Sequence, residues 1–163
     1  MSSKSARPVL VLLILAAFIF PRATFAGTAP QRREVKVYLV ALDDDGRSGQ
    51  KIGCGDSLVP VTRRIGARRP TLRIAIQELL LIPHEYDARL KNFWRGRNLR
   101  VRSVSVNRAG VATIHIAGAG PQVAGVCDQP RIESQIEETA KQFPNVRRVR
   151  VFVNGRTLAS AIR

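Results

Sequence analysis

Apolar residues recur with two different periods along the chain, and the clearest change of period comes in its last third. Within residues 128–143, apolar side chains repeat at helical spacing and charged side chains take other positions, which predicts an amphipathic helix. Residues 149–153 then alternate valine with Arg150 and Phe152, which predicts a strand with one covered and one open side. This stretch therefore predicts a helix that packs against one face of a sheet.

The preceding residues show the same two patterns. In chain order they predict a strand at 35–41, a helix at 71–82, and the two strands of a hairpin at 99–106 and 111–117. Residues 58–63 are also extended, but Pro60 lacks a backbone N–H, which confines this segment to a sheet edge or an isolated ribbon. We therefore expect residues 58–63 to be peripheral.

The first hairpin strand changes phase along its length. Leu99 and Val101 alternate in one phase, whereas Val104 and Val106 follow the other. A single extra residue in a strand shifts every later side chain to the opposite face. The change of phase therefore predicts a bulge near Ser103.

Without the peripheral segment, the order of elements is β-α-β-β-α-β, which defines an α+β fold class. Right-handed crossovers place both helices on one face of a four-stranded antiparallel sheet, as in split β-α-β folds. The other face of this sheet is then open. We expect it to mix cations with aromatic rings as a binding surface formed by Lys36, Tyr38, His115, Arg148, Arg150 and Phe152.

Residues 1–26 have the pattern of a secretory signal peptide. Lys4 and Arg7 precede an apolar run over residues 9–20, and Ala26 ends a stretch that suits signal peptidase. The run is shorter than the roughly 20 residues that span a bilayer, and an uncleaved anchor is the alternative. No cysteine follows the cleavage position, so we expect an exported protein, periplasmic or extracellular, that is not lipid-anchored.

The remaining chain is strongly basic. Removal of residues 1–26 lowers the formal net charge from +15 to +12. Residues 27–34 predict a disordered lead-in, and residues 35–163 are long enough for a single domain with its own core. A basic surface of this kind fits anionic polymers such as wall polymers, lipid headgroups or DNA, and a surface whose charge only keeps the protein soluble is the alternative.

Cys54 and Cys127 are expected to form a disulfide, because exported chains fold in an oxidising compartment. Free thiols and a metal pair are the alternatives. A bridge would join a loop in the first half of the chain to the loop before the second helix. In the chain-entropy model, closing so long a loop contributes about 4 kcal/mol to the free energy of unfolding.

Side chains able to do chemistry form no catalytic pattern. His84 lies at a helix end and His115 inside a predicted strand, so both are interpreted as surface or packing residues. Glu137 and Glu138 are adjacent on a helix and point in different directions, so they do not form a carboxylate pair. The sequence therefore predicts no enzyme, no metal site and no cofactor.

Two further stretches have both a binding and a structural interpretation. Residues 43–45 are aspartates, as in calcium loops, but Arg47 stands where the next ligand is needed, so we expect an acidic turn. Residues 84–97 contain aromatic side chains in a polar setting. They form either a binding lip or an apolar cluster beneath a long loop.

Several short segments, in this order, match one known pattern. They are Val37-Tyr38-Leu39, Leu58-Val59-Pro60-Val61-Thr62-Arg63, Glu78-Leu79-Leu80, Ser103-Val104-Ser105-Val106, Gly110-Val111-Ala112, Glu137-Glu138-Thr139-Ala140 with Gln142-Phe143-Pro144, and Val153-Asn154-Gly155. In these segments the chain resembles the GerMN domain family, exported bacterial domains named from sporulation and spore germination proteins. The resemblance implies a non-catalytic domain outside the cytoplasm, often in lipoproteins or fused to cell-wall amidases. This sequence lacks the lipid-attachment cysteine, a second copy and an enzyme domain, so a sporulation role does not carry over with the resemblance.

Three functions are compatible with these features. The first, favoured by the resemblance, is a non-catalytic interaction or scaffolding module of the bacterial cell envelope that binds a protein or a cell-wall polymer. The second is a basic module that binds polyanions through its open sheet face. The third is a cell-wall hydrolase or an accessory to one. The sequence predicts no oligomeric state.

Overall fold

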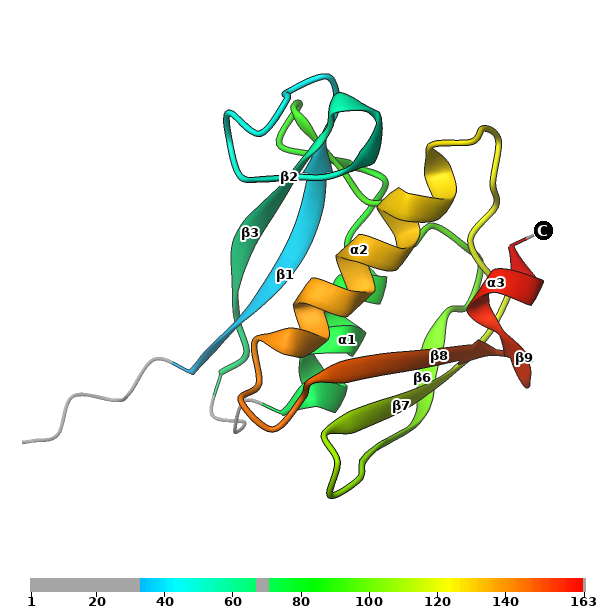
Figure 1. Ribbon diagram of the computed structural model, residues 1–163. Helices are drawn as coiled ribbons and strands as arrows, with labels where there is room; N and C mark the ends of the chain where they lie inside the picture. Colours follow the sequence, from blue (N-terminus) through cyan, green and yellow to red (C-terminus); the bar gives the residue numbers. More distant parts are fainter. Residues whose placement is uncertain (1–32, 67–70, 163) are drawn as a thin grey trace, which may run out of the picture. The chain divides into compact units, whose positions relative to one another are not determined.

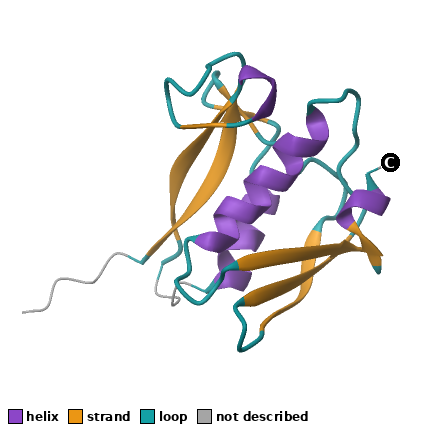
Figure 2. Ribbon diagram, in the orientation of Figure 1, coloured by secondary structure: helices purple, strands orange, loops and turns teal. Residues whose placement is uncertain are grey.

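Two sheets and two main helices make up the part of the chain that the computed structural model describes, residues 33–66 and 71–162 (Figures 1 and 2). The first sheet has the order β2-β3-β1-β5-β4, with β1 at Glu34–Ala41, β2 at Gln50–Lys51, β3 at Ser57–Arg64, β4 at Glu85–Tyr86 and β5 at Leu90–Lys91. The second has the order β6-β7-β8-β9, with β6 at Arg100–Val106, β7 at Val111–Ala117, β8 at Arg148–Val153 and β9 at Arg156–Thr157. The helices are α1 at Leu72–Leu81, α2 at Asp128–Lys141 and the short α3 at Leu158–Ala161, with a 3-10 turn at Gly53–Gly55. The predicted signal peptide and most of the predicted lead-in lie outside the described residues.

The strand β3 is the main partner of β1, so residues 58–63 are an integral part of the first sheet and it is wrong to leave them out of the topology, whereas the expected place at a sheet edge is confirmed from Val59 onward. The two strands pair antiparallel over their whole length, from Glu34 opposite Arg64 to Ala41 opposite Ser57. Pro60 fits because β2 pairs with β3 only at Ser57 and Leu58, which leaves the outer side of Pro60 without a neighbouring strand among the described residues. The proline therefore marks one edge of a strand whose other edge is fully paired.

The second sheet contains the predicted hairpin. β6 and β7 pair antiparallel, with a register shift between Val101 and Ser103 that confirms the predicted bulge. β8 pairs with β7 in parallel along its whole length, because α2 carries the chain back to the end where β7 began. On the other side of β8, β9 pairs only with Phe152 and Val153.

Polar side chains of α2 close the edge of β1 that faces away from β3, and Figure 1 shows the helix between the β1–β3 ribbon and β8. Thr139 Oγ1 accepts a hydrogen bond from Tyr38 N at 3.1 Å, and Gln135 Nε2 donates to Tyr38 O at 2.9 Å. The side chain of Gln142 accepts from Lys36 N at 2.9 Å and donates to Lys36 O at 2.7 Å. β5 pairs with the same edge farther along. The backbone N–H and C=O groups on this edge of β1 thus find hydrogen-bond partners without a strand of the second sheet.

The predicted single antiparallel sheet is therefore wrong in two respects. β1 belongs to a different sheet from the hairpin, and β7 and β8 are parallel. Both differences have one cause. In a split β-α-β sheet the first strand separates the two strands that flank the second helix, whereas here β1 is bonded to β3 and α2, so β8 pairs directly with β7. The α+β fold class itself is confirmed.

One main apolar core joins both sheets to α1 and α2. Its fully buried side chains include Leu39, Ile76, Ile114 and Ile132. Trp94, 1% exposed, also belongs to it, and its Nε1 donates to the Ile132 carbonyl at 2.8 Å. The aromatic residues that follow α1 therefore contribute to the main core rather than to a binding lip or a separate cluster.

We expect Thr139→Val to lower the free energy of unfolding by about 1–3 kcal/mol, because the isosteric change leaves the amide of Tyr38 without an acceptor at a fully buried site. Thr113→Val is the matched control, because Thr113 lies on the face of β7 that points away from the helices, and it should change the free energy of unfolding by less than about 0.5 kcal/mol. Urea denaturation followed by circular dichroism measures both variants. A Thr139→Val variant as stable as the Thr113→Val variant would contradict the role assigned to Thr139.

Candidate functional site

The outer face of the second sheet is the surface where most of the predicted binding residues gather. In β7, the residues that face the helices, Ala112, Ile114 and Ile116, are buried, and the alternate residues point to the other side. The parallel register sets Thr113 beside Arg150, and the antiparallel register sets Ser105 beside Thr113. We call this surface the outer face, and it includes Ser103, Ser105, Val111, Thr113, His115, Arg148, Arg150 and Phe152.

Two rings stack on the outer face. The ring centroids of His115 and Phe152 lie 4.9 Å apart and their planes differ by 13°. Arg148 and Arg150 lie on the same side of β8 and are exposed. Within the described residues, no hydrogen bond or ion pair engages either guanidinium group. The outer face thus combines a flat aromatic patch with two arginines that are available to an anion.

Lys36 and Tyr38, the other residues predicted for this surface, lie in β1 of the first sheet. Their backbone groups bond to α2. The side chain of Tyr38 is half-buried, and burial followed by the charge of Glu138 raises the pKa of its hydroxyl. The structure therefore brings together His115, Arg148, Arg150 and Phe152, but not Lys36 or Tyr38. A binding role for each of these residues stays a prediction.

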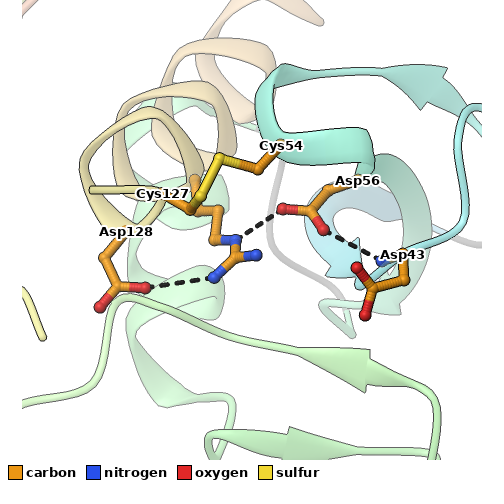
Figure 3. The surroundings of a disulfide bond; sticks show 6 residues. Asp43, Cys54, Asp56, Cys127 and Asp128 are labelled. Atoms are coloured by element: carbon orange, nitrogen blue, oxygen red, sulfur yellow. Dashed lines mark hydrogen bonds and ion pairs between the residues drawn. A yellow bond between two sulfur atoms is a disulfide. The ribbon is translucent and has the colours of Figure 1, made fainter. Parts of the chain in front are cut away.

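The predicted disulfide is confirmed, because Cys54 and Cys127 are bonded with their Cα atoms 6.0 Å apart (Figure 3). Cys54 lies in the 3-10 turn between β2 and β3, and Cys127 directly precedes α2. The bridge ties the loop before β3 to the start of the helix. Structural disulfides persist in oxidising compartments, which agrees with a location outside the cytoplasm.

A buried ion pair lies beside the disulfide, and Figure 3 shows its hydrogen bonds as dashed lines. Arg131 donates from Nε to Asp56 Oδ2 at 2.6 Å and from Nη1 to Asp128 Oδ1 at 3.3 Å. Asp56 is fully buried and also accepts from Asp43 N at 3.1 Å. Burial alone would lower the pKa of Arg131, but the hydrogen bond and charge of Asp56, followed by those of Asp128, outweigh burial and raise the pKa. The loop before β3 is therefore held to α2 by an ionic as well as a covalent link.

This ion pair was not apparent from the sequence, because Asp56 and Arg131 are 75 residues apart. Pairing two such residues requires knowledge of which loop meets which helix. The two cysteines, the only ones in the sequence, did indicate that the loop around Cys54 meets the start of the second helix, and the ion pair lies at the same contact. A charged residue close in sequence to each cysteine was the available signal.

Other residues considered for chemistry make structural contacts. His84 Nδ1 lies 2.9 Å from the carbonyl oxygen of Asn92. Asp44 accepts hydrogen bonds from Ser57 Oγ and from Ser48 N, each at 2.6 Å, and these lower the pKa of its carboxyl. Across residues 33–66 and 71–162, no three His, Cys, Asp or Glu side chains are grouped so as to hold a metal ion. The helices of the same residues are too short or too polar to cross a membrane.

Comparison with known proteins gives one family. Residues 36–159 match the Germane family, which is described as "Sporulation and spore germination". A search of curated proteins finds no match.

Solved structures show the same fold. The tandem GerMN domains of the sporulation protein GerM from Bacillus subtilis are similar at a TM-score of 0.56 and 21% identity, over 81% of this chain and 41% of that one. The chain thus spans about two fifths of the tandem structure. The first GerMN domain of the same protein is similar at a TM-score of 0.53 and 16% identity, over 77% of this chain and 85% of that one.

We expect Cys54→Ser combined with Cys127→Ser to lower the free energy of unfolding by up to about 4 kcal/mol, because the bridge restricts the unfolded chain across a separation of 73 residues. Calorimetry measures the loss as a lower melting temperature. A thiol reagent should find no free thiol in the untreated native protein. Titratable thiols in that sample, or an unchanged melting temperature of the double variant, would contradict a stabilising bridge.

Proposed function

The chain belongs to the Germane family of sporulation and spore germination domains, and on that premise we propose that it is a non-catalytic interaction module of the bacterial cell envelope. The description of the family names cellular processes and no reaction. The observation that carries the proposal is the outer face, a sheet surface that presents stacked rings and exposed arginines. Ser103 lies opposite His115 on this surface, but no hydrogen bond joins the two side chains in the described part of the chain, as an activated nucleophile requires, so the surface is better suited to binding than to covalent chemistry.

In this proposal the chain is exported through residues 1–26 and acts in the periplasm or outside the cell. The Cys54–Cys127 disulfide supports an oxidising location. The positive charge that remains after removal of this segment attracts anionic polymers, which are abundant in bacterial envelopes.

A second candidate function, binding of an anionic polymer, is favoured by one specific arrangement on the outer face. Arg148 and Arg150 project on the same side of one strand, next to the stacked rings of His115 and Phe152. Each guanidinium offers donors in a fixed fork to phosphate or carboxylate groups. Because neither arginine recognises a particular sequence of groups, this binding is weak, sensitive to salt and unselective.

We expect binding to wall teichoic acid and to duplex DNA to weaken steeply between about 50 and 200 mM salt, since each neutralised phosphate releases counterions. Arg148→Ala combined with Arg150→Ala should reduce the slope of log affinity against log salt by about 1.8 for DNA, which corresponds to two lost phosphate contacts. Fluorescence anisotropy with labelled polymer measures both slopes.

Arg89→Ala combined with Arg97→Ala is the matched control. Both residues are exposed and lie outside the outer face, so the control removes the same charge from another surface. Its slope should stay closer to that of the unmodified protein. Absence of binding at low salt, or equal slopes for the two double variants, would refute a specific role of the outer face.

A further inference from the structure

One edge of β8 is open. β7 pairs with one edge of the strand, while β9 pairs with the other only at Phe152 and Val153, so Arg148–Val151 have no strand neighbour there in the described part of the chain. Arg148 N donates to Gly110 O, and farther along Asn154 N donates to Ile116 O. The N–H groups of the even-numbered residues therefore point toward β7. Those of Val149 and Val151, with their carbonyls, point toward the open edge.

A groove lies beside this edge, between α2 and β8, whose positions Figure 1 shows. It has a volume of about 180 Å³ and is lined by the apolar side chains of Ile136, Val149, Val151 and Leu158 and by the carboxylates of Glu133 and Glu137. Val149 and Val151 are half-buried, so part of their apolar surface remains accessible from the groove.

We propose that an extended segment of a partner protein adds to the open edge as a further strand of the second sheet. Strand addition supplies backbone hydrogen bonds to Val149 and Val151, and alternate side chains of the segment supply specificity. Side chains in one phase are apolar and enter the groove. Those in the other phase are acidic and lie on the outer face beside Arg148 and Arg150.

The charges of β8 favour an acidic partner over a second copy of this chain. Two copies of β8 paired edge to edge would set the arginines of one strand beside those of the other, and like charges in cross-strand positions are destabilising. Charged side chains on an open edge are a recognised means of preventing self-association. The same arginines attract glutamate or aspartate in an added strand.

The inference rests on the proposed role as an interaction module and adds the chemistry of a protein partner. It differs from polymer binding in the atoms involved. A polysaccharide or nucleic acid meets the guanidinium groups on the outer face, whereas an added strand also requires the backbone of Val149 and Val151. This difference allows the two to be tested separately.

The test uses the complete exported chain, labelled with ¹⁵N, and a capped peptide of about eight residues that alternates valine with glutamate, long enough to cover the open edge at roughly 3.3 Å per residue. Addition of the peptide should slow hydrogen exchange at the amides of Val149 and Val151 and leave that of Arg150 unchanged. Two isomers of the peptide, N-methylated at either all valine or all glutamate amides, serve as matched controls. One isomer should lose binding and the other should retain it, because only alternate amides of a strand face its neighbour.

The charge pattern is tested with a peptide that alternates valine with lysine. It should bind about 10-fold more weakly, since attractive cross-strand pairs become repulsive ones. Arg148→Glu combined with Arg150→Glu should reverse the preference between the two peptides. Arg89→Glu combined with Arg97→Glu, which changes the net charge equally, should not reverse it.

Three results would overturn the inference. Equal binding of both methylated isomers would place the peptide on the outer face alone. No binding at about millimolar peptide, where even weak complexes form, would show that the edge accepts no strand. Protection of Val149 and Val151 that rises with protein concentration in the absence of peptide would identify a second copy as the occupant. In each case, salt-sensitive polymer binding would still support the proposed function on its own.

Discussion

The hydrogen bonds from α2 to the edge of β1 are the constraint on which the rest of the structure depends. Gln135 and Thr139 are fully buried, and polar groups removed from water are costly unless they find partners. The backbone N–H and C=O of Tyr38 also require hydrogen-bond partners, and the side chains of Thr139 and Gln135 supply them. Gln135 also accepts from Phe93 N at 2.7 Å, so one side chain links β1, the helix and the aromatic segment after α1. A helix here takes the place that a strand would occupy in a continuous sheet.

This arrangement explains the surfaces that the second sheet offers. Since β1 is bonded elsewhere, β8 lies next to β7 and keeps an open edge beside α2. Arg148 and Arg150 lie at the junction of two surfaces, the outer face and that edge. The disulfide and the Arg131–Asp56 ion pair hold the start of α2 against the first sheet. The polar side chains of α2 are thereby kept in register with β1.

Features that depend on local pattern or on a single possible pairing were predictable from the sequence. The helices and the hairpin follow from apolar periodicity, the bulge from a change of phase, and the disulfide from having only two cysteines. Membership of each sheet was not predictable, because Gln135, Thr139 and Gln142 resemble an exposed helix face. Their partners lie 97 to 106 residues earlier. The same limit applies to the site. Alternation correctly grouped the residues of β7 and β8, but it carries no information on whether Lys36 and Tyr38 share their sheet.

Amide hydrogen exchange in the free protein, measured residue by residue by NMR, tests the division into two sheets most directly. The amides of Lys36 and Tyr38 should be protected, since side chains of α2 accept hydrogen bonds from them. Protection should alternate along β8, so that the amides of Arg150 and Phe152 exchange slowly and those of Val149 and Val151 exchange rapidly. If Val149 and Val151 were protected as strongly as Arg150 regardless of protein concentration, their edge would be paired within the chain, and the division of the fold by α2 would be contradicted.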